Sequence, residues 1–289
     1  MTKEIKKPAL IGGGVIGTQI AYQMAFRGFD VHVYDINDEA VARSKKQVDE
    51  TALLYQEDLG VSQEETDAAK ARMTYYTDLA ECVKDCDFVV EAIIEDVGAK
   101  KDIFSKLSEL CPKETIFATN SSTFIPSQLI DAVDRPERFL AFHFMIMIWR
   151  NKQCDVMMGP STDPEVFDAV VRFGEAMDLK VLRIKKEQPG YIINSLLIPL
   201  LDAALDLLAR GVASPEDIDY TWKVGTKAAV GPCVMMDRIN LKTVYYTFNS
   251  IYEKTKADKY KTIVDYVKTN FIDQNKFGME SGEGFYKYN

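Results

Sequence analysis

The sequence predicts an α/β fold, with a doubly wound sheet domain over residues 1–187 and an all-helical domain over residues 188–289. Short apolar strand patterns alternate with helical patterns through the first two-thirds of the chain, which is typical of a parallel sheet with helices on both faces. From Pro189-Gly190 onward the hydrophobic period changes from 2 to 3.6 and stays there. A chain of 289 residues is also more typical of two domains than of one.

The individual elements follow from the same patterns. Beyond the first two strands, we expect strands over 88–90, 115–118, 139–144, 156–158 and 181–184. Helices are expected over 98–110 and 164–177, and a charged helical excursion over about 38–72 is expected to hold two more, 38–59 and 63–72. The second domain is expected to contain helices over 190–211 and 215–227 and others to about residue 269. Its most apolar run, 191–208, is interrupted by Asn194, Pro199, Asp202 and Asp206. These interruptions favour a buried helix over a membrane-spanning one.

The first 35 residues indicate a dinucleotide cofactor. An apolar strand over 9–11 runs into Gly12-x-Gly14-x-x-Gly17, and an amphipathic helix follows to about residue 27. Gly12 permits the tight turn, Gly14 lets the backbone approach a pyrophosphate, and Gly17 lets the helix pack close to the sheet. The phosphates would then lie at the helix N-terminus, beside Val15 and Ile16, where free N–H groups favour negative charge. The pattern predicts a Rossmann-type domain.

Asp35 indicates which dinucleotide binds. It closes the second strand, 31–34, where a carboxylate accepts hydrogen bonds from the ribose hydroxyls and repels a 2′-phosphate. Ile36 and Asn37 follow, so no arginine stands next to it to hold that phosphate. The alternative is that Asp35 only caps the next helix. We predict NAD(H) rather than NADP(H).

Composition limits the classes of partner. The net charge of −9 argues against nucleic acid as a partner. The five cysteines show no CxxC pair and no His/Cys metal-ligand spacing, so we expect reduced thiols and no metal. The first residues lead straight into a strand pattern, which predicts no signal peptide and, with the thiols, a cytoplasmic protein that does not bind a membrane.

Candidate catalytic residues gather where strands end. His143 follows 139–142, and it is the stronger of the two histidines because His32 lies inside a strand. Asp155 starts the next strand, where a hairpin-like return would bring it beside His143 and let it orient the imidazole. The segment Asn120-Ser121-Ser122-Thr123 follows another strand, although a helix cap or an ST-turn is favoured for Ser121 and Thr123. Asn194 is a polar residue in an apolar helix and should be paired.

These residues belong to a wider set of motifs. The chain resembles the L-3-hydroxyacyl-CoA dehydrogenases of the 3-hydroxybutyryl-CoA dehydrogenase type over nearly its whole length, through I-G-G-G-V-I-G, V-V-E-A-I-I-E, A-T-N-S-S-T, F-H-F, P-G-Y-I-I-N, V-G-P and S-G-E-G-F-Y-K-Y. The resemblance implies that Ser122, His143 and Asn194 surround the reacting carbonyl. It also implies that Glu95 and Lys100, with Asn120, lie on the cofactor side.

The resemblance implies an NAD-dependent oxidoreductase that interconverts 3-hydroxyacyl and 3-oxoacyl groups. His143 would be the acid and base, Asp155 would orient it, and Ser122 and Asn194 would hydrogen-bond the substrate oxygens. It also implies a homodimer through the helical domain, which would bury apolar helix faces.

Departures from the family pattern concern the substrate. The acid at 155 is aspartate where the family has glutamate. The position of a CoA-contacting lysine falls on Asp58, while its neighbouring serine falls on Thr51. An acid at position 58 is expected to repel a CoA phosphate rather than hold it. Four apolar residues have two possible interpretations: Met145, Ile146, Met147 and Met235. Their side chains either line a remodelled substrate pocket or only line a core. Alternatives are therefore a reductase of a CoA-free ketone, 3-oxo acid or imine, and a non-catalytic NAD-binding relative.

Overall fold

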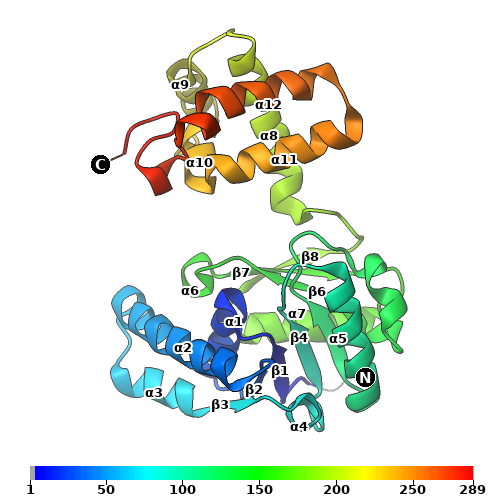
Figure 1. Ribbon diagram of the computed structural model, residues 1–289. Helices are drawn as coiled ribbons and strands as arrows, with labels where there is room; N and C mark the ends of the chain where they lie inside the picture. The colour runs from blue at the N-terminus through cyan, green and yellow to red at the C-terminus, as the bar shows by residue number, and fades with distance from the viewer. Residues whose placement is uncertain (1–3, 289) are drawn as a thin grey trace. The chain divides into compact units, whose positions relative to one another are not determined.

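The computed structural model describes residues 4–288. Residues 1–3, on which the expectation of no signal peptide partly rests, lie outside the described residues. The chain divides into two compact units, Met1–Ile192 and Ile193–Asn289, both drawn in Figure 1. The predicted boundary after residue 187 lies slightly before this division. The first unit is α/β and the second is helical, as the sequence predicts.

One sheet of eight strands forms the centre of the first unit, in the order β3-β2-β1-β4-β5-β6-β7-β8. All neighbours are parallel except β6 and β7, which are antiparallel. The order of the strands reverses between β1 and β4, and in such sheets ligands bind at this point, outside the carboxyl ends of the strands. The strands are β1 Pro8–Ile11, β2 Val31–Tyr34, β3 Met73–Tyr76, β4 Phe88–Glu91, β5 Ile116–Thr119, β6 Phe139–Phe144, β7 Gln153–Met158 and β8 Lys180–Ile184.

Helices cover both faces of this sheet, because successive strand side chains point to opposite sides. In β1, Leu10 packs into one core with residues of α1, whereas Ala9 and Ile11 pack into the other with residues of α5 such as Phe104. The helices of this unit are α1 Val15–Phe26, α2 Asp38–Leu59, α3 Gln63–Ala71, α4 Leu79–Val83, α5 Val97–Leu110, α6 Ile148–Asn151 and α7 Pro164–Ala176.

Local capping explains where the helical excursion begins. The Asn37 side chain accepts a hydrogen bond from the Ala40 N–H at 2.8 Å, so Asn37, and not Asp35, caps α2. Gly60 ends that helix with a φ of 68°, which glycine adopts without strain. Ser62 and Glu65 form a capping box at the start of α3. The suggestion that Asp35 serves only as a cap is therefore wrong.

The described part of the second unit contains five α-helices: α8 Tyr191–Ala209, whose first two residues belong to the first unit, α9 Pro215–Thr226, α10 Pro232–Ile239, α11 Leu241–Thr255 and α12 Asp258–Asn270. Leu201, Leu205 and Leu208 of α8 enter the core of this unit with Phe248 of α11. By length and composition α8 could cross a membrane, but Asp202 in its middle pairs with Lys259 at 2.7 Å.

The expectation of a buried α8 is wrong for part of the helix. Leu196 is 68% exposed, and only 22% of the apolar window is buried. The reason is that α8 presents one face to the core of its unit and leaves apolar side chains on the other face uncovered.

The C-terminal motif S-G-E-G-F-Y-K-Y has a structural explanation. Buried Asp237 of α10 accepts hydrogen bonds from the Phe285 and Tyr286 N–H groups at 2.9 and 3.0 Å and from the Tyr288 hydroxyl at 2.7 Å. Burial raises the pKa of this carboxyl. A Cβ atom on Gly284 would lie 2.0 Å from Asp237 Oδ1, so only glycine fits there.

Three short elements escape the sequence patterns. The edge strand β3 is only four residues long and pairs with β2 alone. The helices α4 and α6 have five and four residues, which is shorter than the window in which a 3.6-residue period can be recognised.

Candidate active site

The glycine-rich turn lies at the carboxyl end of β1, at the point where the strand order reverses. Gly12 has a φ of 104°, and a Cβ atom there would lie 2.7 Å from the Ala92 carbonyl oxygen. A Cβ atom on Gly17 would lie 2.0 Å from the Gly12 carbonyl oxygen, whereas one on Gly14 would meet nothing within 4 Å. The α1 N-terminus has no side-chain cap and no acid in its first turn. This cradle, with Val15 and Ile16 at its rim, fits a pyrophosphate.

The different surroundings of Gly14 and Gly17 make a testable pair. Gly17→Ala is expected to lower the melting temperature of the cofactor-free protein, because its methyl group collides with the backbone of the turn. Gly14→Ala is expected to keep the melting temperature and to weaken NADH binding, because the space it fills belongs to the ligand. Differential scanning fluorimetry and NADH fluorescence titration measure the two effects. Equal melting temperatures for both variants would contradict this assignment.

Asp35 is held in place at the end of β2. Its Oδ2 accepts a hydrogen bond from the Gly13 N–H at 3.0 Å and its Oδ1 accepts one from the Ile36 N–H at 2.8 Å. Each oxygen keeps a lone pair for a further donor, such as a ribose hydroxyl. Ile36 itself is 73% exposed and offers no cation for a 2′-phosphate. These residues fit NAD(H).

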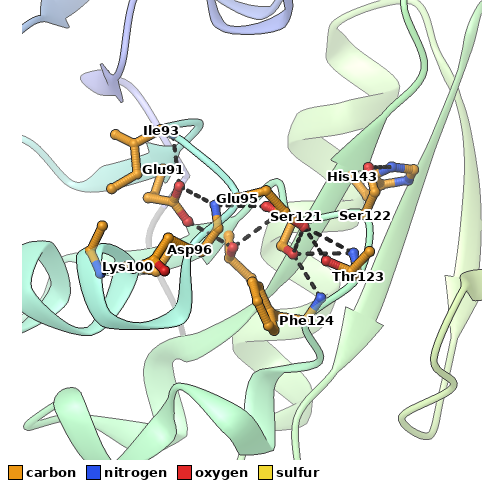
Figure 2. A network of polar contacts seen from close by, with 12 residues as sticks. Glu91, Ile93, Glu95, Asp96, Lys100, Ser121, Ser122, Thr123, Phe124 and His143 are labelled. Atoms are coloured by element: carbon orange, nitrogen blue, oxygen red, sulfur yellow. Dashed lines mark hydrogen bonds and ion pairs between the residues drawn. The ribbon is translucent and has the colours of Figure 1, made fainter. Parts of the chain in front are cut away.

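The histidine at the end of β6 has a partner on each nitrogen. His143 and Asp155 are directly paired residues of the antiparallel β6–β7 ladder, and His143 Nδ1 lies 3.2 Å from Asp155 Oδ2. Ser122 Oγ lies 3.1 Å from His143 Nε2 (Figure 2). Both His143 and Asp155 are buried. Directly opposed residues have Cβ atoms only about 4.5–5.5 Å apart, which explains why the shorter aspartate still reaches the imidazole.

A buried ion pair supports the loop next to this histidine. Lys100 Nζ lies 2.6 Å from Glu91 Oε1 and 3.2 Å from Glu95 Oε2, and both Lys100 and Glu91 are fully buried. Glu91 also accepts hydrogen bonds from the Ile93 N–H and the Thr119 hydroxyl, each at 2.8 Å. As Figure 2 shows, the network continues from Glu95 to the segment that carries Ser122. The sequence analysis predicted Glu95 and Lys100 but missed Glu91, although it stands in the same motif.

The hydrogen bonds of Glu95 predict a pH effect. Burial opposes ionisation, but donors from Ser121 and Thr123, with Lys100, outweigh it and lower the Glu95 pKa to about 2. A carboxyl group whose pKa is lowered by folding stabilises the folded state at pH values above its pKa in the unfolded chain, which is about 4.3. That contribution is lost as the pH falls towards 2.

Glu95→Gln is therefore expected to flatten the loss of stability between about pH 4.5 and the acid limit, as measured by urea unfolding across pH. Glu109→Gln, at an exposed position on α5, is the matched control. An unchanged slope in the Glu95 variant would refute the prediction.

The segment between β5 and the first 3₁₀ turn has its own internal bonds. The Ser121 hydroxyl accepts from the Thr123 and Phe124 N–H groups at 3.2 and 2.8 Å, the ST-turn considered as an alternative. It also donates to Glu95 at 2.5 Å. Asn120 Oδ1 accepts the Phe144 N–H at 3.0 Å and so ties the ends of β5 and β6 together. That oxygen is thus committed to the protein, and a cofactor contact of Asn120 stays a prediction.

Comparisons with known proteins decide the family. The family model for the 3-hydroxyacyl-CoA dehydrogenase NAD binding domain matches residues 7–188, and that for the C-terminal domain matches residues 190–288. The chain belongs to the 3-hydroxyacyl-CoA dehydrogenase family. It is therefore an enzyme of a family of NAD-dependent oxidoreductases that act on CH–OH groups.

Within this family the chain is similar to proteins of different names. It is 32% identical to the human mitochondrial hydroxyacyl-coenzyme A dehydrogenase over 98% of this chain and 91% of that protein. It is also 32% identical to a 3-hydroxybutyryl-CoA dehydrogenase of Clostridioides difficile, over 98% of this chain and 99% of that one. A solved structure of a diketoreductase, described as acting on dicarbonyl compounds, is 43% identical with a TM-score of 0.92 and covers 99% of this chain and 100% of that one.

Asp58, at the family's lysine position, is exposed and pairs with other side chains of the protein. Its carboxylate accepts a hydrogen bond from Trp149 Nε1 at 2.6 Å, and it forms a two-point ion pair with Arg150 through Nε and through Nη2 at 2.8 Å. The bonds from Arg150 and Trp149 lower the Asp58 pKa. The expected repulsion of a phosphate is therefore weaker than the sequence suggests, because Arg150 balances the charge. What this position lacks is a free cation.

The apolar candidates have different surroundings. Met145 and Ile146, which follow β6, are 36% and 60% exposed, so they do not merely line a core. Met147 is partly buried against the core on one face of the sheet, and its N–H donates to Gln19. Met235 packs against the core of the second unit. Asn194 lies in α8 within the second unit and is exposed, so the expectation of a buried amide that must be paired is wrong. Its role toward the substrate stays a prediction.

The remaining polar candidates are structural. His32 Nδ1 lies 2.7 Å from the Cys82 carbonyl oxygen, as expected of a packed strand residue. Asp85 and Cys86 lie close to that ring, but Asp85 pairs with Lys7 at 2.5 Å. All five cysteines are free and buried, which agrees with the predicted reduced thiols.

Proposed function

We propose that this family member uses NAD(H) to interconvert a 3-oxo and a 3-hydroxy group on compact dicarbonyl substrates that carry no CoA. The arrangement of Ser122, His143 and Asp155 supports the chemistry. Asp58 stands at the family's lysine position and is paired with Trp149 and Arg150, so this position offers no free cation to a CoA phosphate. This observation supports a substrate without CoA.

The residues supply a proton path. In the reducing direction His143 donates the proton on Nε2 to the carbonyl oxygen, while its Nδ1–H remains hydrogen-bonded to Asp155. In the oxidising direction the neutral Nε2 accepts the alcohol proton, and Asp155 stabilises the imidazolium that forms. Ser122 donates to the same oxygen and orients it. The cofactor held at the glycine turn and Asp35 would supply the hydride for the carbonyl carbon as NADH and would take it up as NAD⁺ in the reverse direction.

Two observations support the proposed substrate class: the charge of the protein and its 43% identity to a diketoreductase. A CoA substrate carries several phosphate charges, which a protein of net charge −9 must hold with a local basic group. At the family position that group is missing, and the nearby Arg150 already pairs with Asp58. The exposed apolar Met145 and Ile146 next to β6 suit an uncharged substrate.

A second candidate is the CoA thioester reaction of the family, favoured by the names of the human and Clostridioides difficile relatives. One assay separates the two. NADH absorbance is followed with ethyl acetoacetate, an aryl diketone and acetoacetyl-CoA at equal concentrations. We expect turnover on the free dicarbonyls and a far higher KM for the thioester. Turnover on the thioester alone would overturn the proposed substrate class, and no turnover on any substrate would favour a non-catalytic NAD-binding protein.

A variant tests the role of the charge itself. Asp58→Lys adds a cation and frees Arg150, so it is expected to lower the KM for acetoacetyl-CoA by about five- to ten-fold at low salt, the size of one or two partly screened charge pairs. The KM for ethyl acetoacetate is expected to stay unchanged. Asp49→Lys, also on α2, is the control for a mere change of net charge. Equal effects of both variants would contradict a local role for position 58.

We also propose that the protein is a homodimer through the helical unit. An apolar groove of about 640 Å³ in that unit is lined by side chains of α8, α9 and α10, among them Leu200, Leu207, Ile218 and Trp222. Large apolar side chains such as Leu196 and Tyr220 are exposed in the same unit. Sedimentation velocity tests this proposal, and a monomer at micromolar concentration would refute it.

A further inference from the structure

Tyr191 lies against the catalytic histidine. It stands in the motif P-G-Y-I-I-N, but the sequence alone assigns it no role. Its ring stacks on the His143 imidazole with centroids 4.3 Å apart and planes inclined by 19°. The side chain is 1% exposed and packs with Ala141, Met157 and Ile184. One face of the imidazole is therefore closed by an aromatic ring.

The hydroxyl end of the same side chain holds the neighbouring loop. Tyr191 Oη donates a hydrogen bond to the Ser121 carbonyl oxygen at 2.7 Å. The next residue is Ser122, whose Oγ lies 3.1 Å from His143 Nε2. One side chain thus contacts the imidazole and also anchors the backbone that carries its hydroxyl partner.

The backbone at this point is unusual for an aromatic residue. Tyr191 has a φ of 57° and follows Gly190 with a φ of 76°. A bulky side chain rarely adopts the left-handed region, and such strain persists only where the surroundings hold it and is often found at functional sites. This conformation directs the ring into the first unit at the start of α8.

We propose that Tyr191 is a positioning residue for His143, which holds the imidazole plane between Asp155 and Ser122 and favours its protonated form through the face of the phenol ring. Asp155 and Ser122 restrain the imidazole only within its plane. The ring of Tyr191 prevents rotation out of that plane and excludes water from one face. A cation over an aromatic face is attracted by the ring quadrupole, so the stack favours the imidazolium, which is the acid in carbonyl reduction.

The charged groups near Tyr191 and His143 are unchanged in all variants considered. They are Asp155 of β7, Glu91 at the end of β4, Glu95 in the loop after it, and Lys100 of α5. Changes at position 191 alone therefore report on the stack and on the hydroxyl bond.

The test uses the fact that the chain has only two histidines. Proton NMR titration resolves His143 and His32, assigned with His143→Gln, in the wild type, Tyr191→Phe and Tyr191→Leu. In Tyr191→Leu the His143 pKa is expected to fall by about 0.5 unit or more, the shift that corresponds to an ordinary cation–π contact. In Tyr191→Phe it is expected to stay, because the ring remains. His32 on β2 is the internal control for the fold.

Kinetics provide the second readout, and this part rests on the proposed function. In Tyr191→Leu, kcat for carbonyl reduction is expected to fall by about ten-fold or more, with the acid limb of its pH profile displaced in the same direction. In Tyr191→Phe, kcat is expected to fall only a few-fold with the pH profile unmoved. The stoichiometry of NADH binding counts the folded sites, and the NADH Kd is expected to be equal in all three proteins.

The outcomes are distinct. An unchanged His143 pKa with unchanged kcat per NADH-binding site in Tyr191→Leu would overturn the positioning role and leave a structural one. Tyr191→Met replaces the leucine variant if that protein does not fold, because it also lacks an aromatic face. A wild-type protein without turnover on any dicarbonyl would defeat the proposed function, whereas the NMR titration would still decide the effect of Tyr191 on His143.

Discussion

Replacing His143 with glutamine is expected to lower turnover by about 10² to 10⁴-fold, the range in which a single positioned acid–base group contributes to catalysis. Glutamine keeps a polar side chain between Ser122 and Asp155 but cannot exchange a proton near neutral pH. The glycine turn and Asp35 are untouched, so NADH is expected to bind with its wild-type Kd. Stopped-flow absorbance and fluorescence titration measure the two quantities.

Two further variants make this result specific. His32→Gln changes the other histidine, which lies on β2 with its Nδ1 against a backbone carbonyl, and it is expected to keep full activity. Asp155→Asn is expected to lower kcat by less than His143→Gln does, because the acid–base group remains while its orientation is weakened. A His143→Gln protein with wild-type kcat would refute the assigned acid–base role and would favour imine reduction or another proton donor.

Replacing Lys100 with methionine is expected to lower the free energy of unfolding by about 3–5 kcal/mol in the absence of cofactor. The reason is the fully buried Glu91 carboxyl group, which would lose its cation and remain buried as an unpaired acid. Methionine has a similar volume, so the loss of packing is small. Urea unfolding at neutral pH measures the change.

A second substitution separates charge from packing in this pair. Adding Glu91→Gln to Lys100→Met removes the uncompensated charge, while the amide oxygen still accepts from Ile93 and Thr119. The double variant is therefore expected to regain most of the lost stability. Lys106→Met, at an exposed position on the same helix, is the control. If Lys100→Met and Lys106→Met lose equal stability, the ion pair does not stabilise this loop.

The cofactor half of the site could be predicted from local sequence. The residues predicted to bind the pyrophosphate and the ribose lie within one strand–turn–helix–strand unit, so the spacing of Gly12, Gly14, Gly17 and Asp35 alone defines their geometry. The same holds for long helices such as α2, whose predicted bounds 38–59 agree with Asp38–Leu59. The short helices α4 and α6 were missed because five and four residues show no helical period.

The catalytic half needs contacts between distant segments. The sequence named His143, Asp155 and Ser122 as candidates, but only the direct pairing of residues 143 and 155 in an antiparallel ladder shows that aspartate is long enough. Asp58 illustrates the opposite case. Its charge is visible in the sequence, yet its pairing with Arg150, far along the chain, weakens the repulsion of a phosphate that the sequence predicts.

What the sequence by itself determined is therefore the order of elements, the family and the cofactor, because periodicity and short motifs act within one or two neighbouring elements. The tertiary structure decided how side chains from different strands complete one another: the stack of Tyr191 on His143, the buried Glu91–Lys100 pair and the engagement of Asp58. Hydrogen bonds and ring contacts act over about 3–5 Å. Only folding brings residues that lie many positions apart in the chain within that range.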